Sequence, residues 1–391
     1  MSATRLDSFG RVDRADAFTV DFEGRAVPAF RGDTVASALL AAGERVVAHS
    51  VLLGRPRGIV SAGAEEPSAL IQVDLPFPEP MLLATTVEAV PGLGISMLCG
   101  QGRLSRAVDP AAYDAIHRHC DVAVVGAGPA GLAAAVTAGA AGARVLLLDD
   151  RPQPGGLLLS DAETRWAATQ LARLTAMGNV EVLDRTTVTG YYDDNYLVAV
   201  QRRNDHETVE LDPTHARQRI WRIRAAEVVL ATGAHERPVV FPGNDVPGVM
   251  LAEAVREYLL RYGVLVGRRV VLFTAHDDAY RVAVDLLIAG AEVTVVDPRP
   301  ADRAGELLPR ALPDGALHTG AVVVGTDTDE NGTLAAVQIR RPDGTVETVP
   351  CEVLAVSGGW NPAGQLFSQS GGKLCWDGDL AAFVPGGAGQ R

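Results

Sequence analysis

The stretch Cys120–Gly156, CDVAVVGAGPAGLAAAVTAGAAGARVLLLDDRPQPGG, decides the fold expected for this chain. The valine-rich run that ends at Val125 predicts a strand, and the alanine-rich segment that follows Gly131 predicts a helix. A second apolar run, Arg144–Leu148, predicts another strand, and Asp149 follows it directly. The stretch therefore predicts a strand, a glycine-rich turn, a helix and a strand with an acidic residue at its end.

The glycines of the turn are spaced as GxGxxG, at Gly126, Gly128 and Gly131. In such a turn the first glycine allows the tight bend, the second lets the backbone approach a pyrophosphate, and the third lets helix and strand pack closely. A pyrophosphate would lie at the helix N-terminus, where unpaired N–H groups favour anions. A carboxylate at the position of Asp149 can accept hydrogen bonds from an unphosphorylated ribose, and the later Gly156 fits the same pattern. The stretch therefore predicts a dinucleotide site.

The alternative is a glycine-rich helix buried in a core or a membrane, because residues 122–143 carry no charge and are numerous enough to span a bilayer. Glycines and a proline interrupt this run, and it divides into a strand-like half and a helix-like half. The pattern favours the dinucleotide unit.

Composition limits the remaining choices. A chain of 391 residues with 47% apolar and 21% charged residues is typical of a globular protein with two or three domains. The net charge of −13 argues against a nucleic-acid or anionic-membrane partner. The first residues contain no apolar signal segment, so we expect a cytoplasmic protein. The four cysteines are far apart in the sequence and predict neither disulfides nor a metal motif; Cys120 is expected in the core.

The N-terminal part has the order of elements found in plant-type ferredoxins. Residues 18–30 predict a hairpin, Val35–Ala42 a short helix capped by Asp33 or Thr34, and Ala69–Val73 a strand. The intervening loop, residues 54–74, contains no cysteine, so it lacks the ligands of a [2Fe–2S] cluster. We interpret this part as a docking or scaffold module, followed by a strand at Met81–Val90 and a connector.

Later segments extend the dinucleotide fold. The sequence predicts a helix and three strands, at Glu163–Met177, Thr186–Tyr192, Tyr196–Arg202 and Glu227–Leu230. The last strand leads into Thr232-Gly233, a small turn expected near the cofactor.

A second strand–helix–strand unit lies at residues 268–297, but its turn, Thr274–Ala279, has no glycine. Asp277 and Asp278 there would repel a pyrophosphate, so this unit should not bind a dinucleotide in the usual way. His276 with these aspartates suggests a metal cluster, but no complementary ligand spacing supports one.

Several blocks in order, among them GDTVASALLAAG, RPRGIVSAGAEEPSALI, LATGAHERPVVFPGNDVPGVM and VSGGWNP, make the chain similar to the alpha subunits of heterotetrameric sarcosine oxidases. The resemblance implies a two-dinucleotide-binding-domain (Rossmann-like) α/β flavoprotein fold with an N-terminal ferredoxin-like β-grasp module. It implies NAD at the GxGxxG site, FMN at a contact with a flavin-bearing beta subunit that handles the amine, and further small subunits. That family continues beyond the position of Arg391 with a folate domain, so a truncated or split product is expected.

The residues expected to contact the cofactor follow from the GxGxxG motif and from the resemblance. They are Gly126, Gly128, Pro129, Ala130, Gly131, Asp149, Asp150, Arg151, Gly156, Val188, Thr232 and Gly233. The expected domains are a cysteine-free ferredoxin-like module (1–100), a connector (101–119), the first dinucleotide-binding domain (120–240), a second, degenerate one (241–345) and a truncated return to the first (346–391).

No nucleophile–base pair is apparent, so no catalytic residue is assigned. No metal ligand is assigned either. Redox chemistry is expected to be carried by cofactors. Arg237, in His235-Glu236-Arg237-Pro238, can pair with a phosphate or carboxylate, or simply with its neighbour Glu236. Trp360, in the turn after Gly358-Gly359, can pack on a flavin, line a subunit contact or fill a core.

The predicted function is the NAD-binding, electron-transfer component of a sarcosine-oxidase-like amine oxidoreductase. Two alternatives remain open. The first is an FAD-containing alpha component of a related proline, opine or cyanide-forming dehydrogenase, because NAD and FAD share the ADP half that this turn binds. The second is a non-catalytic nucleotide-binding scaffold.

Overall fold

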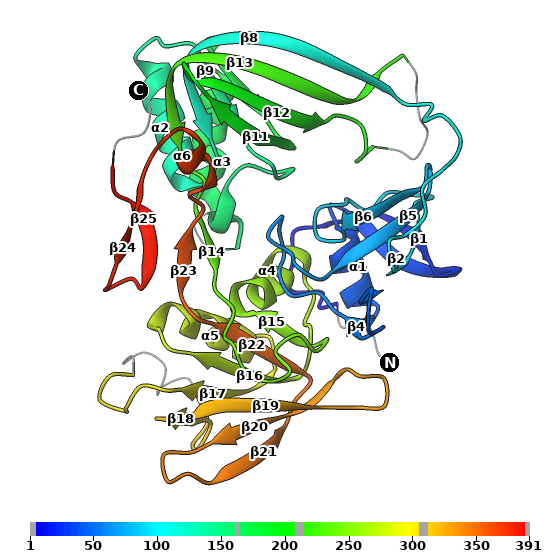
Figure 1. Ribbon diagram of the computed structural model, residues 1–391, viewed down its shortest axis with the longest axis vertical. Helices are drawn as coiled ribbons and strands as arrows, with labels where there is room; N and C mark the ends of the chain where they lie inside the picture. The colour runs from blue at the N-terminus through cyan, green and yellow to red at the C-terminus, as the bar shows by residue number, and fades with distance from the viewer. Residues whose placement is uncertain (1–4, 161–163, 208–213, 305–311, 388–391) are drawn as a thin grey trace. The chain divides into compact units, whose positions relative to one another are not determined.

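The computed structural model describes residues 5–160, 164–207, 214–304 and 312–387 (Figure 1). The chain forms two units, each built from separated segments. One, here called the N-terminal unit, combines residues 1–109 with residues 236–359. The other, here called the glycine-turn unit, combines residues 110–235 with residues 360–391. Each unit is described by itself.

The glycine-turn unit contains a six-stranded sheet in the order β10-β9-β8-β13-β12-β11, with β10, β9, β8 and β13 parallel and β12 and β11 antiparallel. Its elements are β8 (Ala112–Val125), α2 (Pro129–Ala140), β9 (Val145–Leu148), η1 (Gly156–Ser160), α3 (Thr164–Thr175), β10 (Val180–Leu183), β11 (Thr186–Tyr192), β12 (Tyr196–Arg202) and β13 (Ala216–Leu230). The predicted order of strand, turn, helix and strand is therefore present, and the uncharged run is not one continuous helix.

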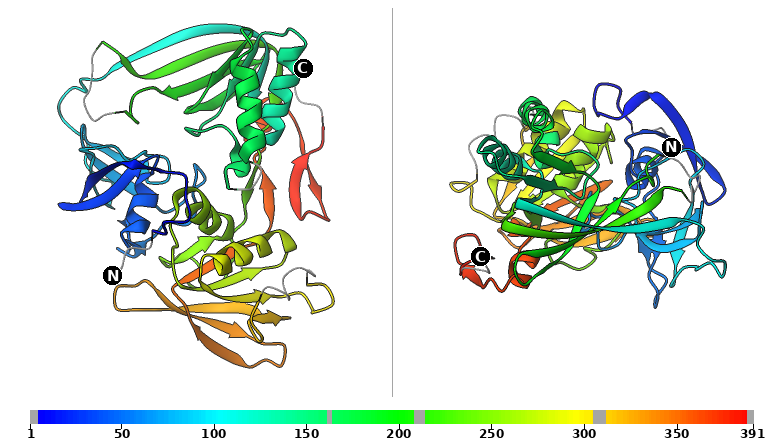
Figure 2. Two further views of the ribbon diagram at one scale, coloured as in Figure 1. Left: turned by 180° about the vertical axis from the view of Figure 1, so that it is seen from behind. Right: turned by 90° about the horizontal axis from the view of Figure 1, so that it is seen from above.

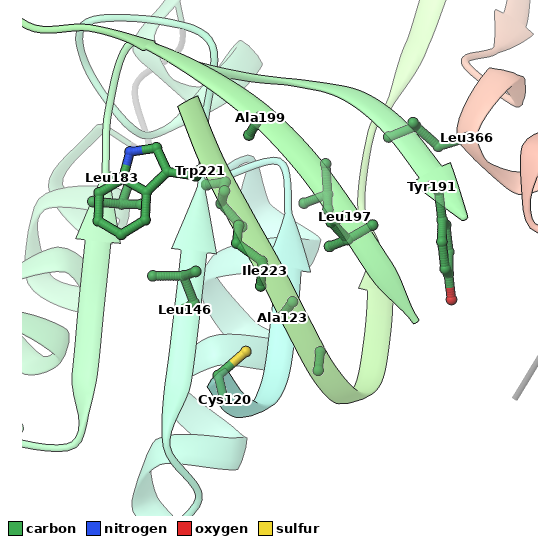
Figure 3. Close-up of a cluster of buried hydrophobic side chains, with 13 residues drawn as sticks. Cys120, Ala123, Leu146, Leu183, Tyr191, Leu197, Ala199, Trp221, Ile223 and Leu366 are labelled. Atoms are coloured by element: carbon green, nitrogen blue, oxygen red, sulfur yellow. The ribbon is translucent and has the colours of Figure 1, made fainter. Parts of the chain in front are cut away.

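Alternate side chains of the central strands fill two cores. Val124 and Leu147 face α2 and α3, which lie side by side along one face of the sheet (Figure 2). Ala123 and Leu146 point to the other face, into the cluster drawn in Figure 3. Cys120 is part of that cluster and is buried, as predicted. Because both faces are covered, these strands read as continuous apolar runs.

Two strands are longer than predicted. β8 begins at Ala112, inside the expected connector, and β13 begins at Ala216, well before the predicted Glu227. They pair in parallel along most of their lengths. Their first halves are partly exposed and carry charged side chains, including the pair Asp114 and Arg219 at 2.6 Å. The apolar pattern reveals only the buried ends of such strands.

The remaining elements of the glycine-turn unit are short. They are β14 (Ala234–Glu236), whose last residue already belongs to the N-terminal unit, β23 (Trp360–Pro362), α6 (Gln365–Gln369), β24 (Leu374–Asp377) and β25 (Ala382–Pro385). Leu366 of α6 packs into the core cluster of Figure 3, and the Gln369 side chain accepts a hydrogen bond from the Tyr191 N–H at 2.9 Å. The later segment of the chain therefore completes a core begun near residue 120.

The N-terminal unit begins with a seven-stranded sheet and one helix. The elements are β1 (Asp13–Phe22), β2 (Arg25–Arg31), α1 (Val35–Ala41), β3 (Ala48–His49), β4 (Pro56–Arg57), β5 (Leu70–Leu75), β6 (Glu79–Leu83) and β7 (Gly94–Cys99). The predicted hairpin is β1 and β2. Thr34 caps α1 in a capping box with Ser37, which resolves the choice between the two predicted caps.

The predicted strand Met81–Val90 is present only as far as Leu83. β6 ends at Leu83, and the chain then turns so that the carbonyls of Ala84 and Val87 accept hydrogen bonds from the first N–H groups of α1. Those helix N–H groups have no partner within the helix, and the turn supplies one. The next strand, β7, lies between β1 and β3 in the sheet and was not predicted from the sequence.

The second part of the N-terminal unit is the second nucleotide fold, a parallel five-stranded sheet in the order β15-β22-β16-β17-β18 with a three-stranded antiparallel sheet, β19-β20-β21. Its elements are β15 (Val249–Leu251), α4 (Ala252–Tyr262), β16 (Arg269–Thr274), η2 (Asp277–Ala279), α5 (Tyr280–Ile288), β17 (Glu292–Asp297), β18 (Leu317–Thr319), β19 (Val322–Thr328), β20 (Leu334–Arg340), β21 (Val346–Pro350) and β22 (Val353–Ser357).

Buried hydrogen bonds join the two parts of this unit. The Leu251 N–H donates to the Val60 carbonyl at 2.8 Å, and the buried Tyr258 hydroxyl donates to the Ser61 carbonyl at 2.9 Å. Arg5 bonds both Asp33, at 2.9 Å, and the Tyr262 carbonyl, at 2.7 Å. The ferredoxin-like module is therefore tied to α4 of the second nucleotide fold.

In the described part of the chain, no helix has the length and apolar character needed to cross a membrane.

Candidate functional site

The turn between β8 and α2 is so tight that two of its glycines cannot be replaced without a clash. Gly126 has φ +98°, and a Cβ there would lie 2.3 Å from the Ala231 carbonyl oxygen. A Cβ on Gly131 would lie 1.8 Å from the Gly126 carbonyl oxygen. The two glycines therefore let β8, α2 and the turn at Ala231 pack backbone to backbone.

Gly128 is different, because a Cβ there would meet no atom within 4 Å. Gly128 is the N-cap of α2, Pro129 and Ala130 open the helix and are exposed, and no side chain caps the first turn. The N–H groups of that turn are thus not satisfied by a side chain and are suited to an anion. Open space over a glycine at a helix N-terminus is what close approach of a pyrophosphate requires.

Asp149, at the end of β9, is 9% exposed, and both carboxylate oxygens accept backbone hydrogen bonds. Oδ2 accepts from the Ala127 N–H at 2.5 Å, and Oδ1 accepts from the Arg151 N–H at 2.9 Å. Burial raises the pKa of this carboxyl, and the two N–H groups oppose that shift. Asp149 therefore fixes the glycine turn in addition to any contact with a ribose, a role that the motif alone did not reveal.

The neighbours of Asp149 divide into two groups. Gly156, with φ +56°, lies against the glycine turn, because a Cβ there would be 3.0 Å from the Gly128 Cα. Asp150 is exposed and Arg151 is half-buried beside it. Val188, in β11, packs its side chain against the core cluster. The structure thus brings Gly156 to the turn and commits the Val188 side chain to the core.

The turn after β13 lies against the glycine turn. The Ala231 N–H donates to the Val125 carbonyl at 2.8 Å. The Thr232 hydroxyl donates to the Ala363 carbonyl at 2.8 Å, so its side chain holds the polypeptide in place. Gly233 has φ +69° and is exposed. Two segments distant in the sequence therefore form one backbone-lined site.

The corresponding turn of the second nucleotide fold is filled by side chains. Asp297, at the end of β17, is 0% exposed and accepts hydrogen bonds from the Arg299 side chain at 2.7 Å and from the Tyr280 hydroxyl. Arg299 also bonds Asp277 at 2.8 Å and the Tyr280 hydroxyl at 2.9 Å. Burial raises the pKa of Tyr280 to about 12, which keeps its proton in this network.

A hydrogen-bonded group that sequence reasoning did not connect lies at the ends of β16 and β22. His276 Nε2 is 2.7 Å from the Ser357 Oγ, and the buried Glu236 carboxylate accepts from the Glu253 N–H at 2.8 Å. Burial raises the pKa of Glu236 to about 8 and lowers the pKa of His276. In the sequence, His276 was considered only as part of a metal cluster and Glu236 only as a partner of Arg237. Ser357 was missed, although its position at the end of the apolar strand β22 could have pointed to it.

Arg237 and the turn after Ser357 pair through their backbones. The Arg237 N–H donates to the Gly359 carbonyl, and the Gly358 N–H donates to the Arg237 carbonyl, each at 2.8 Å. The Glu236 carboxylate accepts from the Glu253 N–H at 2.8 Å. Trp360 is half-buried.

Residues for a metal centre are not gathered anywhere in the described ranges, where no group of three or more His, Cys, Asp or Glu side chains could hold an ion. Cys99 and Cys375 are exposed and Cys351 is buried, and all are free thiols. Burial raises the pKa of Cys351 to about 12.

Comparison with known proteins places this site in a family. Residues 120–382 match the family model of the pyridine nucleotide-disulphide oxidoreductases. The chain belongs to this family. The predicted fold class is therefore confirmed, and the fold implies binding of FAD or NAD(P). Residues 15–98 match the 2Fe-2S iron-sulfur cluster binding domain, but that range contains no cysteine, so its residues do not fit such a cluster.

Individual relatives agree with this assignment. The chain is 48% identical to the alpha subunit of the sarcosine oxidase of Corynebacterium sp. (strain P-1), over 97% of its own length and 41% of that protein. It is 30% identical to one subunit of the opine oxidase of Agrobacterium tumefaciens (strain Ach5), over 68% of its length and 57% of that protein. The predicted resemblance to sarcosine oxidase alpha subunits is confirmed, and the chain spans about two fifths of their length.

The crystal structure of L-proline dehydrogenase from P. horikoshii superimposes with a TM-score of 0.73, at 21% identity, over 99% of this chain and 68% of that one. At this identity the match supports the fold alone.

Proposed function

We propose that the turn between β8 and α2 binds the ADP part of a dinucleotide, NAD in the first instance. The observation that carries the proposal is the open space over Gly128 at an α2 N-terminus that no side chain caps. Around it, Gly126, Gly131 and Gly156 approach closely enough that only backbone lines the site. A pyrophosphate would accept hydrogen bonds from the first N–H groups of α2.

The adenosine ribose would lie near the carboxyl end of β9. Asp149 is buried there and holds the Ala127 N–H, and the exposed Asp150 follows it. Two carboxylates at this position disfavour a 2′-phosphate, so the proposal is NAD rather than NADP. Pro129, Ala130, Arg151, Thr232 and Gly233 would border the nucleotide, and Val188 would contribute at most its backbone.

We further propose that the chain acts as the electron-transfer alpha component of a sarcosine-oxidase-like amine oxidoreductase. The similarity to sarcosine oxidase alpha subunits supports this role. A beta subunit with a flavin would oxidise the amine, and an FMN would lie at a subunit contact. The chain's own residues would bind and orient the nucleotide, and redox chemistry would be supplied by the cofactors. We also propose that the chain divides into domains at residues 1–100, 101–119, 120–240, 241–345 and 346–391.

A second candidate has its own support in the similarity to the opine oxidase subunit. In that case the first nucleotide fold would hold FAD, because FAD and NAD present the same ADP half to the glycine turn.

The test is to purify the chain with its native partners, denature it and identify every nucleotide released. Release of NAD supports the first proposal, and release of FAD with a flavin spectrum of the chain supports the second. If the chain releases no nucleotide and gains none at saturating NAD or FAD, the site is a scaffold and both proposals fail. Oxidation of sarcosine by the complex, measured separately, tests the wider role.

A further inference from the structure

The loop between α1 and β5 is the part of the ferredoxin-like module that would have to hold a [2Fe–2S] cluster. The match to the cluster-binding domain spans residues 15–98, and this range contains no cysteine. In a cluster domain, thiolate ligands and hydrogen bonds to the sulfur atoms hold such a loop around the cluster. Residues 58–63 of this loop are nevertheless mostly buried, so another group must accept hydrogen bonds from their backbone N–H groups.

That group is the Glu66 carboxylate. Glu66 is 5% exposed, and both of its oxygens accept hydrogen bonds from the loop. Oε2 accepts from the N–H groups of Val60, at 2.9 Å, and Ser61, at 2.6 Å, and from the Ser61 hydroxyl at 3.2 Å. Oε1 accepts from the N–H groups of Ser68, at 2.8 Å, and Ala69, at 2.9 Å. Four backbone N–H groups therefore converge on one anion that the loop itself supplies.

These bonds do more than close a local turn. Ser68 and Ala69 come shortly after Glu66 in the chain, whereas Val60 and Ser61 precede it by 6 and 5 residues. A side chain that bonds only its nearest neighbours caps a turn, but one that bonds both ends of the segment 60–69 ties those ends together. Burial raises the pKa of Glu66, and the backbone N–H groups oppose that shift because they can only donate to the ionised form.

The residues that Glu66 holds also bond the second nucleotide fold. The peptide group between Val60 and Ser61 donates its N–H to Glu66 and accepts with its carbonyl from the Leu251 N–H at 2.8 Å. The Ser61 carbonyl accepts from the Tyr258 hydroxyl at 2.9 Å. Tyr258 is 1% exposed, and burial raises its pKa well above the usual value, so the hydroxyl keeps the proton that it donates. The loop is thus held by Glu66 through its N–H groups and by β15 and α4 through its carbonyls.

Close packing accompanies these hydrogen bonds. A Cβ on Gly58 would lie 2.8 Å from the Pro247 Cα, so the backbone of the loop touches the backbone that leads into β15. Arg57 pairs with Asp245 at 2.7 Å immediately beside this contact. The loop is therefore a principal contact of the module with the second nucleotide fold.

We infer that the Glu66 carboxylate takes the place of an iron–sulfur cluster as the anion that organises this loop, and that the loop joins the ferredoxin-like module to β15 and α4. The loop requires a negative group that accepts backbone N–H bonds, and the sulfur atoms of a cluster and a carboxylate both provide one. The inference concerns the N-terminal unit and does not depend on which dinucleotide the first nucleotide fold binds.

Hydrogen–deuterium exchange of the full chain, read by mass spectrometry, tests the inference with Glu66→Gln. The variant keeps the size of the side chain but removes the anion and turns an amide group toward N–H donors. We expect exchange in residues 58–70 and in residues 249–262 to become at least about ten-fold faster, and exchange in the hairpin of β1 and β2 to stay the same. Glu65→Gln is the matched control, because Glu65 is partly exposed and takes no part in these bonds.

Two results of this experiment would overturn the inference. Unchanged exchange in residues 58–70 would show that the carboxylate does not organise the loop. Faster exchange confined to residues 58–70 would show that the loop does not join the module to α4. If Glu66→Gln fails to fold, Tyr258→Phe decides, because it removes only the bond to the Ser61 carbonyl. Faster exchange should then appear in residues 58–70 as well as in residues 249–262, and a change confined to the second range overturns the inference.

A separate measurement tests the replacement of the cluster. The full chain is incubated with ferrous iron and sulfide in the absence of oxygen and then freed of excess reagent. We expect no absorption spectrum of a [2Fe–2S] cluster, because residues 15–98 supply no thiolate. Stoichiometric iron and sulfide with such a spectrum would overturn the inference.

Discussion

The chain contains the strand–turn–helix–strand unit twice, and the two copies differ in whether their turn leaves room for a ligand. In the first, the turn from Gly126 to Gly131 is lined by backbone, and Gly128 faces open space. In the second, the turn from Thr274 to Ala279 includes a 3-10 turn and has side chains at every position. The glycine at 128 leaves room for a ligand, whereas the side chains of the second turn fill that room.

The acidic residue after the second strand shows the same contrast. Both units have Asp-x-Arg-Pro there, and in both the Asp accepts the N–H of the Arg two residues on, at 2.9 Å for Asp149 and 2.8 Å for Asp297. The other oxygen of Asp149 holds the backbone of the glycine turn. Asp297 instead binds the Arg299 side chain and Tyr280. The same local motif therefore organises a site in one unit and closes it in the other.

The largest effect is expected from Gly131→Ala. The new Cβ would overlap the Gly126 carbonyl oxygen, so the free energy of unfolding of the glycine-turn unit should fall by about 3 kcal/mol. Urea unfolding measures the change. Gly178→Ala is the control, because a Cβ there meets nothing. Equal stability of the two variants would mean that α2 does not pack on β8 as closely as described.

Gly128→Ala separates binding from stability. Its Cβ points into open space, so the free energy of unfolding should change by less than about 0.5 kcal/mol. The added methyl would occupy the space over the turn, and the affinity for NAD or FAD should fall at least about ten-fold, or about 1.4 kcal/mol. Calorimetric titration measures the affinity. Undiminished affinity would place the pyrophosphate elsewhere.

Matched substitutions of the two acidic residues compare the units directly. Asp149→Asn should weaken nucleotide binding by about 1–3 kcal/mol, because charged hydrogen bonds to the ribose and to the Ala127 N–H are lost. Asp297→Asn should leave that binding unchanged and reduce stability, because Arg299 loses the buried one of its two ionic partners and keeps only Asp277. Binding and unfolding are measured on both variants. Nucleotide occupancy unaffected by Asp149→Asn would show that this carboxylate is misassigned.

The free energy of unfolding of the second nucleotide fold should also fall as the pH rises. The pKa of Glu236 is about 8 in the folded chain against an ordinary 4.5, so the folded state retains a proton that the unfolded state releases. This stabilisation is complete below about pH 4.5 and is lost progressively as the pH rises to about 8. Glu253, with its pKa raised to about 7, acts in the same direction.

Urea unfolding between about pH 5 and pH 8 measures this dependence. Glu236→Gln should flatten the curve and leave the part that comes from Glu253. A wild-type curve that rises with pH over this range would contradict the assignment.

The smallest effect is expected from Thr232→Val. The variant loses the hydrogen bond from Thr232 to the Ala363 carbonyl, so stability should fall by about 1 kcal/mol. Nucleotide affinity should stay within about two-fold, because the turn faces the site with its backbone. A large loss of affinity would assign the hydroxyl to the ligand instead.

Much of the glycine turn could be predicted because its chemistry is local. Close approach of the backbone segments requires glycine at Gly126, Gly131 and Gly156. The spacing of these glycines in the sequence indicates that requirement. The limits of β8 and β13 could not be predicted, because their exposed halves carry a charged pattern that resembles a loop. β7 was missed because its short run is stabilised by pairing with β1, β3 and β5, which are distant in the sequence.

That the first nucleotide fold keeps the glycines of a dinucleotide turn and the second lacks them can be read from the residues alone, because a missing Cβ is a property of each residue. Which side chains fill the second turn depends on how the strands pack. Arg299 reaches Asp277, and Ser357 meets His276, because parallel strands bring their carboxyl ends to one edge of the sheet. Burial at that edge then raises the pKa of Glu236 and lowers the pKa of His276. The spacing of residues in the sequence does not indicate which of them are buried.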